Sequence, residues 1–300
     1  MNVDGVLKTS FFCEEAKKVG VRIDGKKVAQ DLRADIKNET IKLWEEKGIR
    51  PHLTVVMVGD HPASQTYVRN KEKACAEMGF GSKLIQLEEM AAEKELLSII
   101  DGLNKDPLVH GILVQLPLPA HLNEELILSG ISPAKDVDGF HPEQVGRLAT
   151  GLDSFKPCTA AGIIELLKAE KINIEGKHAV IIGRSNIVGK PLIQLFLEEN
   201  ATVTVCHSHT RNLAEITKLA DILVVAIGKP EFLTSEMVQE GAVIVDVGIN
   251  RLASGKLVGD VDFEDVFDKV SAITPVPGGV GPMTITMLLK NTLKSAQTKN

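Results

Sequence analysis

Apolar runs and amphipathic segments alternate along the chain in two series. The first series has apolar runs at 53–58, 83–87 and 111–115, separated by helical patterns over 25–48, 63–78 and 92–103. The second has runs at 179–182, 202–205, 222–226 and 243–247, with helical patterns from 159, over 187–198 and 212–219, and over 282–294. The runs are continuous stretches of Val, Ile and Leu, which is typical of parallel strands covered on both faces. The pattern predicts an α/β protein.

The segment between the two series breaks this periodicity. It contains Gln115-Leu-Pro-Leu-Pro119, Ser132-Pro133 and Lys135-Asp-Val-Asp-Gly139, all of which carry turn-forming residues. We therefore expect a functional loop region or a boundary here, and two α/β domains with a ligand cleft between them. The helix that opens the second series is expected to have Thr159 as its N-cap.

Composition narrows the class of protein. The 300 residues include 34 basic and 40 acidic side chains, a formal net charge of -6, and 44% are apolar. A chain of this kind is expected to be soluble and globular, with a core large enough for two domains. Only 4% of residues are aromatic and there is no basic surplus, which disfavours binding of nucleic acid. No run approaches the roughly 20 apolar residues that span a bilayer, so we do not expect a membrane protein.

The N-terminus and the cysteines favour a cytoplasmic protein. Residues 1–20 lack the pattern of a signal or transit peptide and are interpreted as an N-terminal extension. The cysteines are scattered without Cys-x-x-Cys or His/Cys ligand spacing, at Cys13, Cys75, Cys158 and Cys206. This favours reduced thiols over disulfides or a zinc site, and no metal is expected.

A glycine-containing turn follows the first strand of the second series. Gly183 ends the apolar run, and Gly189 lies at the start of the next helix. A strand, a tight turn and a helix of this kind bind dinucleotides, because small residues let the pyrophosphate approach backbone N–H groups at the positive end of the helix. The pattern departs from the common one, since Ser185 occupies the second glycine position and the last glycine comes one residue late.

The next strand end indicates which dinucleotide is bound. An acidic residue here would bond the ribose of NAD and repel a 2′-phosphate, but the chain reads Cys206-His-Ser-His-Thr-Arg211. The missing carboxylate, together with Arg184, Ser208 and Arg211, favours NADP. The alternative is a plain turn with a few polar residues, and the two histidines are assigned to a solvated loop.

A second candidate site lies on the helix predicted at 63–78. Ser64, Tyr67 and Lys71 share one face of that helix, and Tyr67 is the only tyrosine of the chain. The alternative is a solvated face with an extended lysine. Short-chain dehydrogenases also pair Tyr with Lys four residues later, but their glycine-rich turn precedes the pair. Here Tyr67 comes more than a hundred residues before Gly183, which argues against that family.

Six motifs, in order, resemble one family. They are Ser64-x-x-Tyr67-Val-x-x-Lys71, His110-Gly-Ile-Leu-Val-Gln-Leu-Pro-Leu-Pro119, Lys135-Asp-Val-Asp-Gly-Phe140, Pro157-Cys-Thr159, Gly183-Arg-Ser-Asn-Ile-Val-Gly189 and Thr274-Pro-Val-Pro-Gly-Gly-Val-Gly-Pro-Met-Thr284. Together they resemble the bifunctional methylenetetrahydrofolate dehydrogenase/cyclohydrolase family, the FolD type, from about residue 25 to 296. The resemblance implies NADP-dependent oxidation of 5,10-methylenetetrahydrofolate to the methenyl form, followed by hydrolysis to 10-formyltetrahydrofolate.

The resemblance also implies the roles of individual residues. Lys71 would serve the hydrolytic step, with Gln115 holding it, Tyr67 lying along the folate and Asp138 accepting the paired N–H donors of the pterin. Further residues implied to bind the substrate are Ser64, Leu116, Pro117, Pro277, Gly278 and Gly279. Residues implied to bind NADP are Cys158, Thr159, Gly183, Arg184, Ser185, Val188, Ser208 and Ile249.

The implied architecture is a three-layer α/β folate-binding domain and an inserted Rossmann-like NADP-binding domain, with the active-site cleft between them. The first would comprise 21–158 and a returning C-terminal helix at 282–300, and the second 159–281. A homodimer is the family expectation, and an edge strand at 202–205 would fit it. Two alternatives stay open, a dehydrogenase without the hydrolytic activity and a non-catalytic NADP-binding regulatory protein of the same fold.

Overall fold

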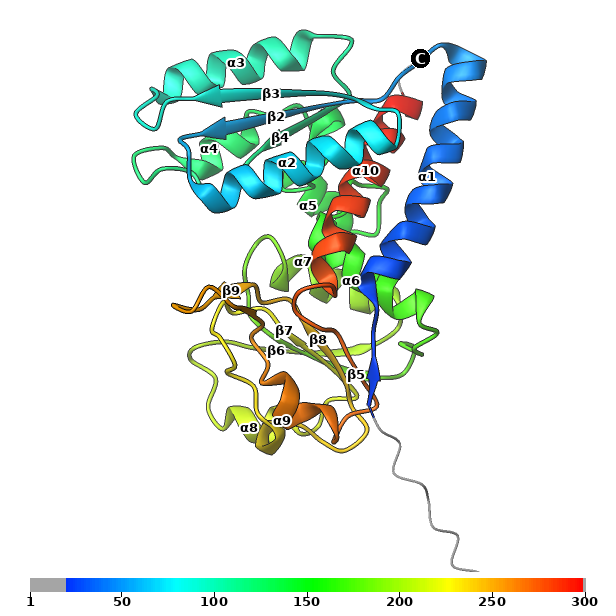
Figure 1. Ribbon diagram of the computed structural model, residues 1–300, viewed down its shortest axis with the longest axis vertical. Coiled ribbons are helices and arrows are strands. Elements are labelled where there is room, and N and C mark those ends of the chain that lie inside the picture. The colour runs from blue at the N-terminus through cyan, green and yellow to red at the C-terminus, as the bar shows by residue number, and fades with distance from the viewer. Residues whose placement is uncertain (1–19, 299–300) are drawn as a thin grey trace, which may run out of the picture.

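The computed structural model describes residues 20–298, which form two parallel sheets connected by long helices (Figure 1). The smaller sheet has the order β3-β2-β4, formed by Gly81–Leu87, His52–Val58 and Gly111–Val114. The larger has the order β1-β11-β8-β7-β5-β6, formed by Val21–Arg22, Ala272–Ile273, Val243–Asp246, Ile222–Val225, His178–Ile182 and Thr202–Cys206. A short antiparallel hairpin pairs β9 (Asn250–Arg251) with β10 (Leu257–Val258).

The helices confirm the predicted α/β alternation. The long ones are α1 (Gly25–Lys47), α2 (Pro62–Glu77), α3 (Glu93–Lys105), α6 (Cys158–Ala169), α7 (Gly189–Glu198) and α10 (Val280–Thr298). The shorter ones are α4 (Glu124–Ser129), α5 (Pro142–Ala149), α8 (Leu213–Thr217) and α9 (Phe263–Phe267), with 3-10 turns at Pro133–Lys135 and Ser235–Met237. No helix within residues 20–298 has the length and apolar character needed to cross a membrane.

Both faces of each sheet are covered, as the continuous apolar runs predicted. In β5, Ala179 and Ile181 belong to a core shared with α6 and α7, whereas Val180 and Ile182 face a second core that includes Val266 of α9. In β2 the same alternation directs one set of side chains toward α1, α2 and α10 and the other set toward α3 and α4. Side chains of alternating direction therefore meet helices on both sides.

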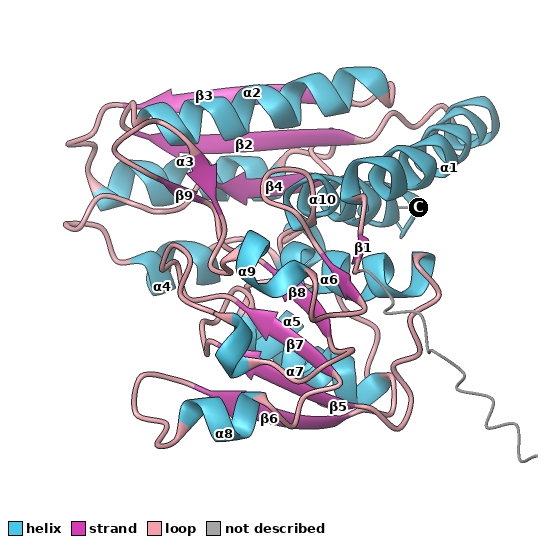
Figure 2. Ribbon diagram, turned by 60° about the horizontal axis from the view of Figure 1, so that its bottom comes forward, coloured by secondary structure: helices cyan, strands magenta, loops and turns pink. Residues whose placement is uncertain are grey.

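Helix α10 connects the two halves of the molecule. It packs against α6 and α1 and also contacts α2 and two strands of the smaller sheet, β2 and β4 (Figures 1 and 2). Arg33 of α1 reinforces the contact, donating from Nε to Thr286 Oγ1 at 2.9 Å and from Nη2 to the Pro282 carbonyl at 3.4 Å. One continuous apolar core thus joins both sheets through α1, α6 and α10.

Three local expectations differ from the structure. Helix α6 begins at Cys158 with Pro157 at the N-cap position, so Thr159 lies inside the first turn and cannot cap it. The Thr159 hydroxyl lies 3.1 Å from Thr284 Oγ1 of α10. The irregular segment between the two series contains α4 and α5, which are too short to show a clear periodicity. Residues 21–22 pair with β11 in the larger sheet, so the chain enters that sheet before it forms the smaller one. The proposed N-terminal extension at 1–20 lies almost wholly outside the described residues.

Replacing Leu166 of α6 by Ala should lower the free energy of unfolding by about 2–5 kcal/mol, because its fully buried side chain contributes to the shared core. Urea unfolding followed by circular dichroism measures this. Leu108→Ala is the matched control, since Leu108 is 73% exposed and should change stability by under about 0.5 kcal/mol. Equal losses in both variants would contradict the assigned core.

Candidate active site

Lys71 and Gln115 meet at the carboxyl end of the smaller sheet. Lys71 lies on α2, and Gln115 directly follows β4, where its backbone N–H bonds the Val56 carbonyl at 2.8 Å. Lys71 Nζ donates to Gln115 Oε1 at 2.9 Å. Gln115 Nε2 donates to the Leu116 carbonyl at 2.7 Å, which orients the amide oxygen toward the lysine. The Leu116–Pro117 peptide bond that follows is cis.

Asp138 lies near enough to Lys71 for their charges to interact, and it belongs to a tightly held segment. Lys135 Nζ anchors that segment by donating to the carbonyls of Leu103 and Asp106, each at 2.6 Å. Gly139 has φ +77°, and a Cβ there would lie 2.5 Å from the Phe155 carbonyl, so only glycine fits without displacement. The segment therefore fixes the position of the Asp138 carboxylate.

Burial controls the ionisation of this pair. It lowers the pKa of the Lys71 amine, while the charge of Asp138 opposes that shift. Burial also raises the pKa of Asp138, and Lys71 and a hydrogen bond with Cys158 oppose it. The site thus holds a lysine whose neutral form is more accessible than in water, a property suited to proton transfer near neutral pH.

Cys158 lies behind Asp138 and is fully buried. Its Sγ donates to the Val137 carbonyl at 3.4 Å. Burial, together with the neighbouring Asp138 charge, raises the pKa of the thiol well above its usual range. The thiol therefore stays protonated and acts as a hydrogen-bond donor rather than a nucleophile.

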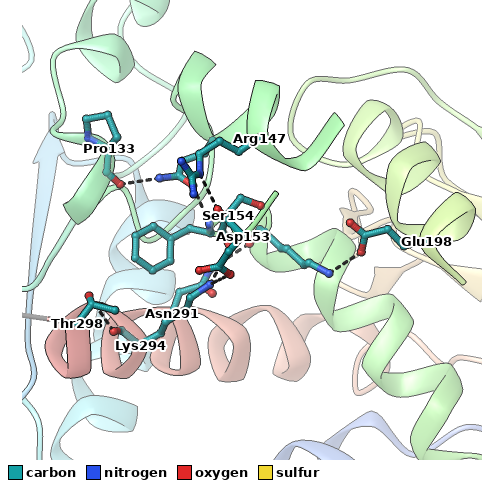
Figure 3. A network of polar contacts seen from close by, with 11 residues as sticks. Pro133, Arg147, Asp153, Ser154, Glu198, Asn291, Lys294 and Thr298 are labelled. Atoms are coloured by element: carbon teal, nitrogen blue, oxygen red, sulfur yellow. Dashed lines mark hydrogen bonds and ion pairs between the residues drawn. The ribbon is translucent and has the colours of Figure 1, made fainter. Parts of the chain in front are cut away.

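Asn291 of α10 was not identified from the sequence, although it supports this segment. Its Nδ2 donates to the carbonyls of Val137 and Lys156 at 2.8 and 3.0 Å. Figure 3 shows it next to Lys294, which bonds Asp153 and the Ser154 carbonyl. Nothing in the sequence pattern of this helix distinguishes Asn291 from its other polar residues. The connection to residues 137 and 156 arises solely from tertiary packing.

A second group of the expected residues lines a cavity of about 1080 Å³ between α1, α2 and the larger sheet. Its walls include Tyr67, Ile249 and the loop residues Pro277, Gly278 and Gly279. Tyr67 is 38% exposed, and its partial burial raises the pKa of the phenol, so the hydroxyl is neutral near pH 7. Lys71, Gln115 and Asp138 lie outside this lining, and Lys71 is one turn of α2 beyond Tyr67. Ser64 is 7% exposed and is also outside it.

The cavity also has cationic walls that the motifs did not indicate. Lys26 at the start of α1 and Arg251 of β9 both line it. Gly25 lets α1 approach the loop, since a Cβ there would lie 1.9 Å from the Gly279 carbonyl. The Val276–Pro277 peptide bond in this loop is cis. Helix α1, α2 and the loop before α10 therefore converge on one cavity.

The carboxyl end of β5 has the features of a dinucleotide site. Gly183 and Gly189 lie against backbone, since Cβ atoms there would fall 2.4 Å from the Ala226 carbonyl and 2.3 Å from the Gly183 carbonyl. Ser185 Oγ accepts from Val188 N and Gly189 N at 3.2 and 3.4 Å as α7 begins. The backbone can therefore approach a pyrophosphate at the positive end of the helix.

Arg184 and Ser208 lie at neighbouring strand ends. β5 pairs with β6, and Gly183 N donates to the Cys206 carbonyl at 2.9 Å, so the residues that follow each strand are adjacent. Both side chains are exposed, and no acidic residue follows β6 before Arg211. This donor set fits the 2′-phosphate of NADP. No group of three or more His, Cys, Asp or Glu side chains within residues 20–298 could hold a metal ion.

The fold and the site define a two-domain dinucleotide-dependent α/β protein with a partly buried lysine at the carboxyl end of the smaller sheet. Family models of the tetrahydrofolate dehydrogenase/cyclohydrolase match almost the whole chain, the catalytic domain at residues 23–138 and the NAD(P)-binding domain at 157–300. The chain belongs to this family.

Close relatives agree with that assignment. The chain is 59% identical over 279 residues to the bifunctional protein FolD of Bacillus anthracis, covering 93% of this chain and 97% of the relative. The crystal structure of the Campylobacter jejuni bifunctional enzyme FolD superimposes with a TM-score of 0.91 at 54% identity, over 93% of this chain and 99% of that one. The Trypanosoma brucei FolD structure, complexed with NADP cofactor and an inhibitor, has a TM-score of 0.89 at 40% identity, over 93% and 98%.

The electrostatics of the site can be measured on the free protein. Competitive acetylation over a range of pH, read by mass spectrometry, should give a pKa for Lys71 below the usual lysine value. Asp138→Asn should lower that pKa further, because it removes the charge that favours the ammonium form. Asp101→Asn, which removes an exposed carboxylate bonded to Lys105, is the control and should leave Lys71 unchanged. No difference between the two variants would contradict the coupling.

Proposed function

We propose that this chain oxidises 5,10-methylenetetrahydrofolate with NADP and then hydrolyses 5,10-methenyltetrahydrofolate to 10-formyltetrahydrofolate. The observation that carries this proposal is the Lys71–Gln115 hydrogen bond beside Asp138, next to a cavity that is also walled by the cofactor sheet. Membership of a family whose relatives are named bifunctional supports both activities. A dehydrogenase alone would not require a buried amine at this position.

NADP is held in this proposal by Gly183, Arg184, Ser185, Val188, Ser208 and Ile249, with Cys158 and Thr159 behind the reacting end. When bound, it supplies the acceptor for the hydride that leaves the one-carbon unit. The substrate cation that remains is delocalised over both folate nitrogens, so this step requires orientation more than a base. The protein contributes the rigid loops on either side of the cavity.

Hydrolysis requires proton transfers, and Lys71 is placed to perform them. Its neutral amine takes a proton from the water that attacks the methenyl carbon, and Gln115 holds Nζ through its amide oxygen. The resulting ammonium then returns that proton to N5 as the N5–carbon bond breaks. The carbinol hydroxyl loses its remaining proton to solvent and becomes the carbonyl of the formyl group on N10. The lowered pKa of Lys71 makes this cycle feasible near neutral pH.

Binding of the folate uses both groups of residues. Asp138 accepts from the N–H donors of the pterin ring, with Ser64, Leu116 and Pro117 nearby. Tyr67 lies along the benzoyl portion, opposite Pro277, Gly278 and Gly279. The cavity takes the remainder of the molecule, and its cations Lys26 and Arg251 face the glutamate carboxylates.

The direct test is an absorbance assay of purified protein with methylenetetrahydrofolate, comparing NADP with NAD and following the formation and decay of methenyltetrahydrofolate. Both formation and decay are expected, with NADP preferred. Reduction of neither cofactor would refute the proposal. Formation of methenyltetrahydrofolate without its catalysed decay would show that the chain is a dehydrogenase without the hydrolytic activity.

Lys71→Met should abolish most of the hydrolysis while it retains much of the dehydrogenation, because methionine keeps the shape of the side chain but cannot carry a proton. A loss of about 10²-fold or more in hydrolysis is expected. Initial rates on methenyltetrahydrofolate and on methylenetetrahydrofolate measure the two steps separately. Equal losses would contradict the role of Lys71.

Arg184→Ala should raise the KM for NADP by about tenfold or more and leave the KM for NAD nearly unchanged, because only NADP has the 2′-phosphate. Steady-state kinetics with both cofactors measure this. Lys190→Ala, which removes an exposed cation from the start of α7, is the control. An unchanged preference in Arg184→Ala would refute the assignment of this residue.

We also propose a cytoplasmic homodimer. The three described cysteines, Cys75, Cys158 and Cys206, are buried free thiols, which suits a reducing compartment. The edge strand β6 offers unpaired backbone groups that a second copy could cover. Analytical ultracentrifugation would determine the oligomeric state.

A further inference from the structure

Two buried carboxylates, Asp246 and Asp260, lie next to each other at the edge of the cavity, which Asp246 itself lines. Asp246 is the last residue of β8 and is 4% exposed, whereas Asp260 follows the β9–β10 hairpin and is fully buried. Neither belongs to the catalytic group around Lys71 or to the turn after β5. Their position therefore needs an explanation of its own.

Six N–H donors surround these carboxylates. Asp260 accepts from the backbone of Ile227 and Gly228 at 2.7 and 2.9 Å and from Asn250 Nδ2 at 2.8 Å. Asp246 accepts from the backbone N–H groups of Gly248 and Asp260, each at 2.9 Å, and of Val261 at 3.0 Å. All six donors are neutral, so each carboxylate organises backbone rather than balancing a cation.

Two glycines make room for the carboxylates. A Cβ at Gly248 would lie 2.2 Å from Asp260 Oδ1, and one at Gly259 would lie 1.7 Å from Asp246 Oδ2. Each carboxylate therefore occupies the space of a missing side chain and lies directly against backbone. Burial raises the pKa of Asp246 to about 7, and its N–H bonds oppose that shift.

The bonded loops border the dinucleotide turn. Residues 226–228 follow β7, and the Ala226 carbonyl is the atom that Gly183 approaches most closely. Residues 247–250 follow β8, and Val247, Gly248 and Ile249 line the cavity. Asp260 thus bonds the loops that follow the adjacent strands β7 and β8, and β7 is the strand that pairs with β5.

We propose that Asp260, held by Asp246, is a positioning residue for the dinucleotide. It fixes the 226–228 and 247–250 loops in the arrangement that contacts the reactive end of NADP, without touching the cofactor itself. The identity of the ligand as NADP rests on the proposed function. The hydrogen bonds that hold the two loops, in contrast, are a property of the free protein.

Asp260→Ala should raise the dissociation constant for NADP about tenfold or more in calorimetry, because Ile227 and Gly228 lose their buried acceptor. Hydrogen exchange of the ligand-free variant should accelerate at 226–228 and 247–250. Asp260→Asn should keep the affinity within about threefold of wild type, because its amide oxygen still accepts from both N–H groups and Asn250 can turn its own amide to accept from the new NH2.

Asp262→Ala is the matched control. It removes a carboxylate two residues away that caps α9 through Asp265 N, and it should lower stability without changing NADP affinity. Wild-type affinity and exchange in Asp260→Ala would overturn the proposal, as would an equal loss of affinity in Asp262→Ala.

If Asp260→Ala does not fold, Asn250→Ala tests the same contact by removing one of its bonds. We expect faster hydrogen exchange at 247–250 and a larger dissociation constant for NADP. No change in either quantity would overturn the proposal. Failure of wild-type protein to bind NADP would instead refute the proposed function, because loop exchange is measured without ligand.

Discussion

The packing of α10 against α1 and α6 is the contact on which the active site depends. The residues of the site come from two sheets, and the apolar core around these three helices determines how the sheets face each other. Without it, Tyr67 on α2 and Ile249 beyond β8 would not line the same cavity. The same helix carries Asn291, whose amide holds the segment next to Asp138.

Desolvation of Lys71 then changes its pKa. A lysine in water is protonated at neutral pH, but burial lowers the pKa of Lys71 while Gln115 fixes its position. Asp138 limits the shift and keeps the amine from becoming too weak a base. Buried carboxylates perform a different task in the cofactor half, where Asp246 and Asp260 hold backbone N–H groups in place. In one half of the molecule burial thus shifts the pKa of a lysine, and in the other half buried carboxylates fix the conformation of loops.

Much of the fold could be predicted from the sequence because its strands are buried on both faces. Continuous apolar runs identified β2, β5, β7 and β8 within a residue or two at each end. Periodicity failed for α4, α5 and the two-residue strands, which are too short to show one. The N-cap at Thr159 was wrong because the helix begins at Cys158, which places Thr159 inside its first turn.

The candidate site divides in the same way. Spacing on a helix placed Tyr67 and Lys71 on one face, and the motif at 183–189 predicted the tight turn between β5 and α7, because both depend on local geometry. The bond from Lys71 to Gln115 joins residues 44 apart, and the contact of Asn291 with Val137 joins residues 154 apart. The sequence by itself determined the chemical groups and their local elements. Only the tertiary structure decided which groups meet, how deeply they are buried and therefore how they ionise, because these properties depend on packing between distant segments.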